Sequence, residues 1–329
     1  METVFLTGAN GFVGLNIAEQ LIESGYDVRA YVRPDSNITY LEPMAVSVYR
    51  GELHDFEAMN SAMAGCDYVI HTAGNTSCYQ ADMPELERTN VEGTRAVVAS
   101  ALHHGVKRLV FTSTTSTIGA RNSRGFQAGE SEPLTGFRAG SPYAQTKIAA
   151  ETIVRSAADQ GLENVILNLA EVVGGYDHNL QWGRMVLAVA HDQVPFIPPG
   201  GGSFCSARNA AHAHVNALTA GRSGENYIIG GVDTDFSTFI AGISELMGQG
   251  FTAPAKQYLW LLLNARLYEK LPGVFKNKPM VDPYRMRVFG GHYFFNSDKA
   301  RQELGYEVAS LDSMLTDAIS WYRENGFIQ

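Results

Sequence analysis

Short apolar runs alternate with helical stretches along the first half of the chain. The runs are apolar at most positions rather than at every second one, which is typical of strands buried on both faces of a sheet. The predicted strands are Thr3–Thr7, Asp27–Arg33, Val46–Tyr49, Tyr68–His71, Arg108–Thr112 and Asn164–Leu169. Between such runs, Val13–Ser24 and Asn90–His104 carry apolar residues at helical spacing. This repeated order predicts an α/β fold, with a parallel sheet covered by helices.

The regular order fades after about Leu169. Residues 195–202 are rich in proline and glycine and predict a loop, while residues 251–296 hold aromatic residues and prolines without a clear period. Tyr227–Gly230 predicts one further strand, and apolar residues from Leu311 onward return to helical spacing. We therefore expect the second half to form a smaller lobe that is partly woven back into the first.

Composition and charge exclude several classes of protein. Of the 329 residues, 45% are hydrophobic and 18% are charged, so the chain can bury a core. The net charge is −9 and no long basic run occurs, which argues against a nucleic-acid partner. Cys66, Cys78 and Cys205 are widely spaced, which suits a reducing compartment, and the N-terminus lacks the pattern of a signal peptide. The most apolar run, Tyr258–Leu263, is too short to span a membrane, so a soluble cytoplasmic protein is expected.

Three glycines follow the first predicted strand and are spaced three residues apart. Gly8 permits a tight turn, Gly11 lets the backbone approach a pyrophosphate, and Gly14 lets helix and strand pack closely. The helix that Val13 opens would add N–H groups and a partial positive charge for the anion. A purely structural turn is the alternative. The strand before the glycines and the helix after them favour a dinucleotide site in a doubly wound sheet of the Rossmann type.

The end of the second predicted strand indicates which dinucleotide binds. A carboxylate there binds the ribose 2′-hydroxyl of NAD, whereas a cation accommodates the 2′-phosphate of NADP. The expected position of the acid is Val32, and Arg33 follows it. Asp35 lies beyond Pro34, where it is a poor substitute for that acid. NADP(H) is therefore favoured over NAD(H), and the alternative is that Arg33 is a solvated loop cation.

A tyrosine and a lysine lie four residues apart in a predicted helix. Ser141 suits the N-cap and Pro142 the first helical position, so Tyr143 falls in the first turn and Lys147 on the same face. A tyrosine is a poor acid or base at neutral pH unless a neighbouring cation stabilises its phenolate. Tyr-x-x-x-Lys is common on helices, but after a dinucleotide loop it indicates acid–base chemistry beside a nicotinamide.

Together these motifs resemble the short-chain dehydrogenase/reductase superfamily. The length and the second lobe are similar to its extended branch, the epimerase/dehydratase family. The resemblance rests on Thr7–Gly14, on His71–Gly74 and on Tyr143 with Lys147. Within that branch, Val28–Arg33 is most similar to the dihydroflavonol-reductase-like group, which reduces ketones with NADPH.

The resemblance implies which residues form the site. Tyr143 would be the general acid and base, Lys147 would hold the nicotinamide ribose and lower the pKa of the tyrosine, and Thr114 would orient the substrate carbonyl. Ser113 is the alternative to Thr114. The residues expected to bind the cofactor are Gly8, Asn10, Gly11, Phe12, Val13, Gly14, Arg33, Glu52, Leu53, His71, Thr72, Ala73, Thr112, Tyr143, Lys147, Leu169 and Val172.

The same resemblance implies two domains. Residues 1–170 would form the dinucleotide-binding Rossmann domain. Residues 171–329 would form mainly the substrate-binding lobe, with about 205–245 returning to the first domain. Two positions depart from the family pattern. Leu169 stands where a proline is usual near the nicotinamide, and Asn209 stands where an acidic residue is usual.

The expected activity is the interconversion of a ketone or aldehyde and an alcohol with NADP(H), on a small, fairly apolar substrate. One alternative is a sugar-nucleotide epimerase or dehydratase that uses bound NAD(P), and another is a non-catalytic NADP-binding sensor or scaffold. No metal site is expected, because His103–His104 and the pair His212 and His214 do not converge on a helix. The resemblance is compatible with a homodimer formed through the helices that contain Asn90 and Tyr143.

Overall fold

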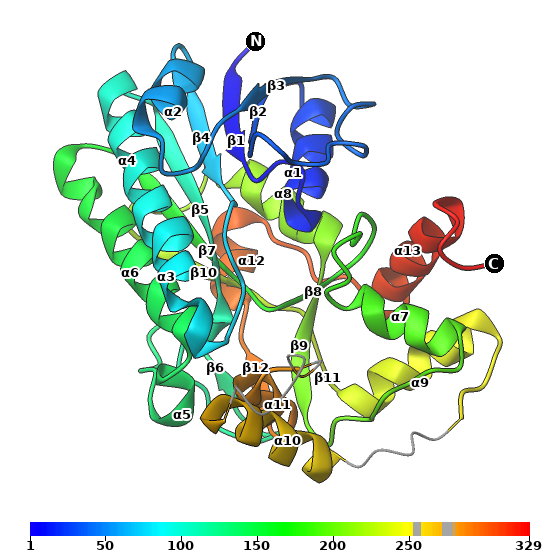
Figure 1. The fold of residues 1–329 in the computed structure, drawn as a ribbon. Coiled ribbons are helices and arrows are strands. Elements are labelled where there is room, and N and C mark those ends of the chain that lie inside the picture. The colour runs from blue at the N-terminus through cyan, green and yellow to red at the C-terminus, as the bar shows by residue number, and fades with distance from the viewer. Residues whose placement is uncertain (253–257, 272–278, 280) are drawn as a thin grey trace.

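The computed structural model describes residues 1–252, 258–271, 279 and 281–329 (Figure 1). Its larger layer is a seven-stranded sheet in which every pair of neighbours is parallel. In spatial order the strands are β10 (Asn226–Ile229), β7 (Asn164–Leu169), β5 (Arg108–Thr114), β4 (Tyr68–His71), β1 (Thr3–Thr7), β2 (Asp27–Val32) and β3 (Val46–Arg50). From β1 the chain adds β2 and β3 toward one edge of the sheet, and it then returns to β4, on the other side of β1, and adds β5, β7 and β10 toward the opposite edge. A ligand site is expected at this change of direction, beyond the carboxyl ends of β1 and β4.

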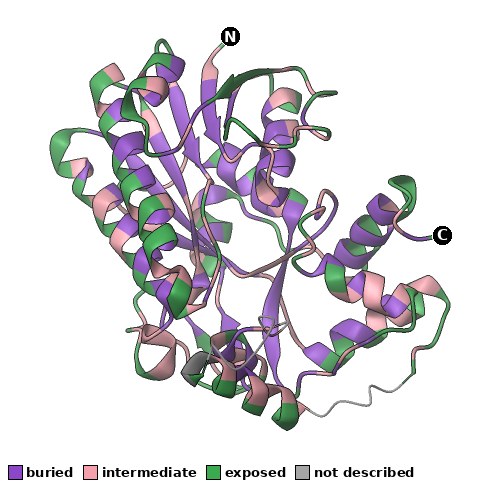
Figure 2. Cartoon of the chain, in the orientation of Figure 1, coloured by how far each residue is buried: buried purple, intermediate pink, exposed green. Residues whose placement is uncertain are grey.

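Helices cover both faces of the sheet, and each face has its own core (Figure 1). One face carries α1 (Phe12–Glu23), α8 (Ala207–Asn216) and α12 (Asp298–Leu304). The other face carries α2 (Phe56–Met63), α4 (Gly93–His104) and α6 (Pro142–Ser156). Figure 2 shows the central strands mostly buried and the outer faces of these helices exposed. The predicted Rossmann-type doubly wound α/β fold is confirmed.

A second sheet lies below the first. Its strand order is β11 (Val232–Asp235), β9 (Gly201–Ser206), β12 (His292–Phe295) and β6 (Gln127–Ala128), and β8 (Glu171–Val173) also pairs with β9. The loop expected over 195–202 is therefore wrong in its last two residues, which begin β9. Glycine suits these positions because a Cβ at Gly201 would lie 2.5 Å from the Thr234 carbonyl oxygen of the paired strand. The glycines that indicated a loop instead allow two backbones to approach closely.

The smaller lobe packs helices against this second sheet. They are α7 (Gly183–Ala190), α9 (Phe236–Met247) and α13 (Leu311–Glu324). Its core is aromatic: the ring of Phe204 stacks on Phe239 with centroids 4.3 Å apart, and Trp182 stacks on Phe236 at 5.5 Å. Such contacts hold large side chains in defined positions.

The segment expected to be irregular, 251–296, contains regular elements. They are α10 (Tyr258–Lys270), α11 (Pro283–Phe289) and β12. The period of α10 is hard to read because apolar residues lie on both of its faces: Ala265 is buried, whereas Leu259 and Trp260 are 71% and 56% exposed. No helix in the described ranges is long and apolar enough to cross a membrane. The remaining short elements are the 3-10 turns η1 (Gln80–Asp82), η3 (Thr115–Thr117) and η4 (Ala158–Gln160), the π-helix η2 (Glu87–Glu92), and the helices α3 (Met83–Leu86) and α5 (Gly136–Ala139).

Candidate active site

The glycine loop joins β1 to α1 and requires glycine for steric reasons. Gly8 has φ +68°, and a Cβ there would lie 2.7 Å from the Ala73 nitrogen at the end of β4. A Cβ on Gly14 would overlap the Gly8 carbonyl oxygen. Gly11 is the N-cap of α1, and no side chain caps the helix there. The first N–H groups of α1 are therefore available to an anion in front of the loop.

A buried polar chain supports the turn after β4. The Ala73 N–H donates to Thr7 Oγ1, and the Thr7 hydroxyl lies 2.7 Å from His71 Nδ1. On the other side of the ring, His71 Nε2 lies 3.0 Å from Thr94 Oγ1, whose hydroxyl donates to the Asn90 carbonyl. This order requires a neutral imidazole that accepts at Nδ1 and donates at Nε2. Burial lowers the pKa of His71 to about 3, in agreement with that state.

The end of β2 presents Arg33 to solvent at the rim of the same region. Arg50, which the sequence reasoning did not single out, donates from Nη1 to the carbonyls of Pro34 at 2.8 Å and of Ser36 at 3.3 Å. The Asn10 side chain donates to the Asn37 carbonyl, which ties this loop to the glycine loop. The backbone that carries Arg33 is therefore held from two sides.

One cavity of about 1130 Å³ runs from the glycine loop to the second sheet. All but one of the residues expected in the site line it. Those that line it are Gly8, Asn10, Gly11, Phe12, Val13, Gly14, Arg33, Glu52, Leu53, Thr72, Ala73, Thr112, Thr114, Tyr143, Lys147, Leu169 and Val172. His71 is the exception, because its ring is fully buried behind the cavity wall. In this geometry the His71 ring supports the Ala73 turn through the Thr7 hydroxyl.

Thr114, Tyr143 and Lys147 converge on this cavity from β5 and α6. Lys147 Nζ donates to the Thr112 carbonyl at 2.9 Å and lies 4.0 Å from the centre of the Phe111 ring. Burial lowers the pKa of Lys147 to about 7. Burial also raises the pKa of Tyr143, against which the Arg285 charge and a hydrogen bond with Thr114 act. Arg285 lowers the pKa of Tyr143 more than any other group does.

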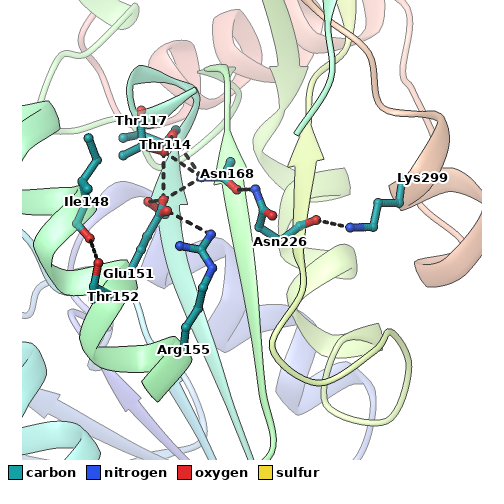
Figure 3. A network of polar contacts seen from close by, with 10 residues as sticks. Thr114, Thr117, Ile148, Glu151, Thr152, Arg155, Asn168, Asn226 and Lys299 are labelled. Atoms are coloured by element: carbon teal, nitrogen blue, oxygen red, sulfur yellow. Dashed lines mark hydrogen bonds and ion pairs between the residues drawn. The ribbon is translucent and has the colours of Figure 1, made fainter. Parts of the chain in front are cut away.

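Glu151, one turn beyond Lys147 on α6, organises the end of β5 (Figure 3). Its Oε1 accepts hydrogen bonds from Ser113 at 2.5 Å, from Thr117 at 2.8 Å and from Asn168 at 2.8 Å. Its Oε2 lies 3.2 Å from the guanidinium of Arg155. The Ser113 hydroxyl is thus engaged away from the tyrosine, and Thr114 is the hydroxyl beside Tyr143.

Charged residues that the sequence reasoning did not assign to the site lie at its substrate end, and three of them matter most here. They are Arg138 on α5, Glu171 on β8 and Arg285 on α11, and all line the cavity. The Glu171 carboxylate accepts a hydrogen bond from Trp182 Nε1 at 2.8 Å, and burial raises its pKa. Arg285 comes from the segment without a clear period, so no local pattern could have placed it here.

Two of the four histidines that were considered for a metal site have other partners. His214 Nδ1 lies 2.7 Å from the Ala210 carbonyl and Nε2 lies 2.8 Å from Thr112 Oγ1. His104 Nε2 lies 2.8 Å from the Asn60 carbonyl. Within the described ranges, no group of three or more His, Cys, Asp and Glu side chains could hold a metal ion.

Comparison with known proteins agrees with this geometry. Residues 4–230 match the model of the NAD dependent epimerase/dehydratase family. A Synechocystis sp. protein assigned as a dihydroflavonol 4-reductase is 31% identical, over 100% of this chain and 96% of its own length. Sterol demethylase protein B of Methylococcus capsulatus is 30% identical, over 99% and 100% of the two chains.

Solved structures show the same relationship. A nucleoside-diphosphate-sugar epimerase of Pseudomonas aeruginosa superposes with a TM-score of 0.80 and 25% identity, over 100% of this chain and 99% of that one. Because the family model spans more than half of the chain and two relatives match it over nearly their whole lengths, the chain belongs to the NAD-dependent epimerase/dehydratase family, the extended branch of the short-chain dehydrogenase/reductases.

Proposed function

We propose that this chain is an NADP(H)-dependent oxidoreductase that interconverts a ketone or aldehyde and an alcohol on a small, fairly apolar substrate. The observation that supports this most is that Tyr143, Thr114 and Lys147 line one cavity that also reaches the glycine loop. A proton donor, a hydroxyl that can orient a carbonyl oxygen and an anchoring cation are the groups that hydride transfer to a carbonyl requires.

The residues at the cofactor end fit a dinucleotide. The uncapped N-terminus of α1 offers N–H groups to a pyrophosphate. Arg33, exposed at the end of β2, would pair with a 2′-phosphate, which favours NADP(H) over NAD(H). Asp35 also lines the cavity on this loop and would oppose that phosphate, so Arg33 must outweigh it.

The proposed mechanism assigns one role to each side chain. When bound, NADPH supplies the hydride to the carbonyl carbon. Tyr143 donates its phenolic proton to the carbonyl oxygen, and its raised pKa keeps it protonated at neutral pH, as a donor must be. Thr114 holds the oxygen beside the phenol. Lys147, which donates to the Thr112 carbonyl, would bind the hydroxyls of the nicotinamide ribose.

Replacing Tyr143 by phenylalanine tests this proposal. The Tyr143→Phe variant should lose at least about 100-fold in turnover of ketones, because general acid catalysis typically contributes that much or more. Its affinity for NADPH, measured by fluorescence titration, should stay within about threefold of the wild type. Tyr26→Phe, far from the cavity, serves as the control. Undiminished turnover in Tyr143→Phe would show that another group donates the proton.

A sugar-nucleotide epimerase or dehydratase is the second candidate. The Pseudomonas aeruginosa relative carries such a name, and the arginines at the substrate end could bind a diphosphate. Enzymes of that kind hold NAD(P) tightly through the catalytic cycle. Purified protein that retains NAD and leaves added NADPH unused with every ketone would favour this candidate. Binding of NADPH without turnover of any ketone or sugar nucleotide would favour a sensor or scaffold.

A further inference from the structure

Arg285 is one of the cationic side chains that line the substrate end of the cavity. Its side chain is 44% exposed, although it lies inside the cavity among residues of both sheets. It comes from α11 in the smaller lobe, while Tyr143 comes from α6; both line the same cavity, and the Arg285 charge lowers the pKa of Tyr143. A guanidinium beside the proton donor is therefore within reach of a substituent close to the reacting carbonyl.

The guanidinium of Arg285 is held in place by contacts that leave some of its N–H donors free. Its Nη2 donates to the Thr76 carbonyl at 2.9 Å, and its Nε lies 3.6 Å from Asp282 Oδ2. Asp282 is itself committed to capping α11, because its Oδ1 accepts from the Arg285 backbone N–H at 2.8 Å. A guanidinium has five N–H donors, so donors remain for a ligand in the cavity. An arginine fixed in this way is suited to recognising a carboxylate.

The surroundings also favour an anion. Arg138 lines the same end of the cavity, and its Nη1 has no hydrogen-bond acceptor among the described residues. Its guanidinium lies over the ring of Tyr293 at 5.0 Å. Glu171 is an acidic residue that lines this space. It already accepts the Trp182 N–H, and burial raises its pKa, which weakens its negative charge. Several aromatic side chains also line the cavity: Phe137, Phe236, Phe289, Tyr293 and Phe295.

We infer that Arg285 binds a carboxylate on the substrate, close to the carbonyl that is reduced, while the aromatic wall holds an apolar remainder. The substrate class is then an oxo acid with an apolar chain. This inference rests on the proposed function for the position of the carbonyl. The anion site itself can be measured without turnover.

The test compares matched acids and neutral analogues. With wild-type protein and NADPH, an apolar oxo acid should have a kcat/KM at least about tenfold higher than that of its methyl ester, since hydrogen bonds to charged groups are worth about that much or more. Arg285→Gln should remove most of this preference, and Arg285→Lys should retain part of it. Arg287→Gln is the matched control, because Arg287 lies on the same helix, is exposed and does not line the cavity. Circular dichroism of each variant checks that it folds.

A binding measurement separates this inference from the proposed function. Octanoate should bind the protein–NADP⁺ complex at least about tenfold more tightly than octanamide in calorimetry, and Arg285→Gln should abolish the difference. If that holds while no ketone is reduced, the proposed reaction is wrong and the anion site stands. Equal binding of acid and amide to the wild type would overturn the anion site. A second result would also overturn the anion site: an Arg285→Gln variant that binds UDP more weakly but still prefers octanoate to octanamide. The Arg285 guanidinium would then bind a diphosphate rather than a carboxylate.

Discussion

Acidification should unfold this protein in part through His71, whose ring is buried between two threonine hydroxyls. Burial lowers the pKa of His71 to about 3, whereas an unfolded histidine titrates at its ordinary 6.5. Below pH 6.5 the unfolded chain therefore binds a proton that the folded chain does not. The stabilisation from a neutral His71 is fully present above pH 6.5 and is lost as the pH falls toward 3.

The size of this effect depends little on the folded-state pKa. At pH 5 the folded imidazole is still neutral, while the unfolded one is almost fully protonated. The pH of 5 lies about 1.5 units below the unfolded-state pKa of 6.5, and each unit corresponds to about 1.36 kcal/mol. The free energy of unfolding is therefore about 2 kcal/mol lower at pH 5 than at pH 8. Since a protein is typically stable by only about 5–15 kcal/mol, a loss of this size is readily measured.

The assay is urea unfolding followed by circular dichroism at pH 8 and at pH 5. His71→Gln should be less stable than the wild type at pH 8, because hydrogen bonds to Thr7 and Thr94 are altered. It should nevertheless lose about 2 kcal/mol less than the wild type between the two pH values. His103→Gln is the control, because His103 is exposed and its replacement should leave the pH dependence unchanged. If wild type and His71→Gln lose equal stability on acidification, the buried neutral histidine is not the cause.

Three further predictions concern the cofactor and its supports. Glu151→Gln should lower the free energy of unfolding by about 3 kcal/mol in urea titrations. The Oε1 atom of Glu151 accepts three hydrogen bonds, and an amide cannot replace all of them. A change below about 1 kcal/mol would contradict this prediction. Arg33→Gln should weaken NADPH binding about tenfold and leave NADH binding unchanged, so equal losses for both cofactors would refute the 2′-phosphate role. Binding of NADPH at pH 8 should take up protons, because an anion favours the charged form of Lys147, whose pKa is about 7. Calorimetry in two buffers of different ionisation enthalpy measures that uptake, and identical heats would argue against it.

The first half of the fold was predictable because most of its strands are buried on both faces; β3, which is largely exposed, is the exception. Thr3–Thr7, Tyr68–His71 and Asn164–Leu169 have the bounds that the apolar runs indicate. Asp27–Arg33 ends one residue early in the structure, and the strand from Arg108 runs on to Thr114. The second sheet was not predictable in this way, because β9 is rich in small residues and takes its stability from close backbone pairing rather than from an apolar pattern.

The cofactor end of the site follows from local sequence, whereas the substrate end does not. Gly8, Gly11 and Gly14 act on their own loop and helix, so their spacing alone indicates the role. Arg285 lines the same cavity as Tyr143 only because α11, more than 100 residues after α6, folds back to that cavity. His71 illustrates a third case: the strand-end position was found, but whether its ring faces a ligand or the interior depends on Thr7 and Thr94.

The last strand of the seven-stranded sheet has a consequence for synthesis of the chain on the ribosome. β7 is buried along its whole length, and one of its edges pairs with β10. Residues 226–229 leave the ribosome only after the excursion through β8 and β9. Until then a nascent chain carries an apolar, unpaired strand edge, which is prone to wrong pairing with other chains. Completion of this sheet late in translation makes β7 the segment that a chaperone would most need to shield.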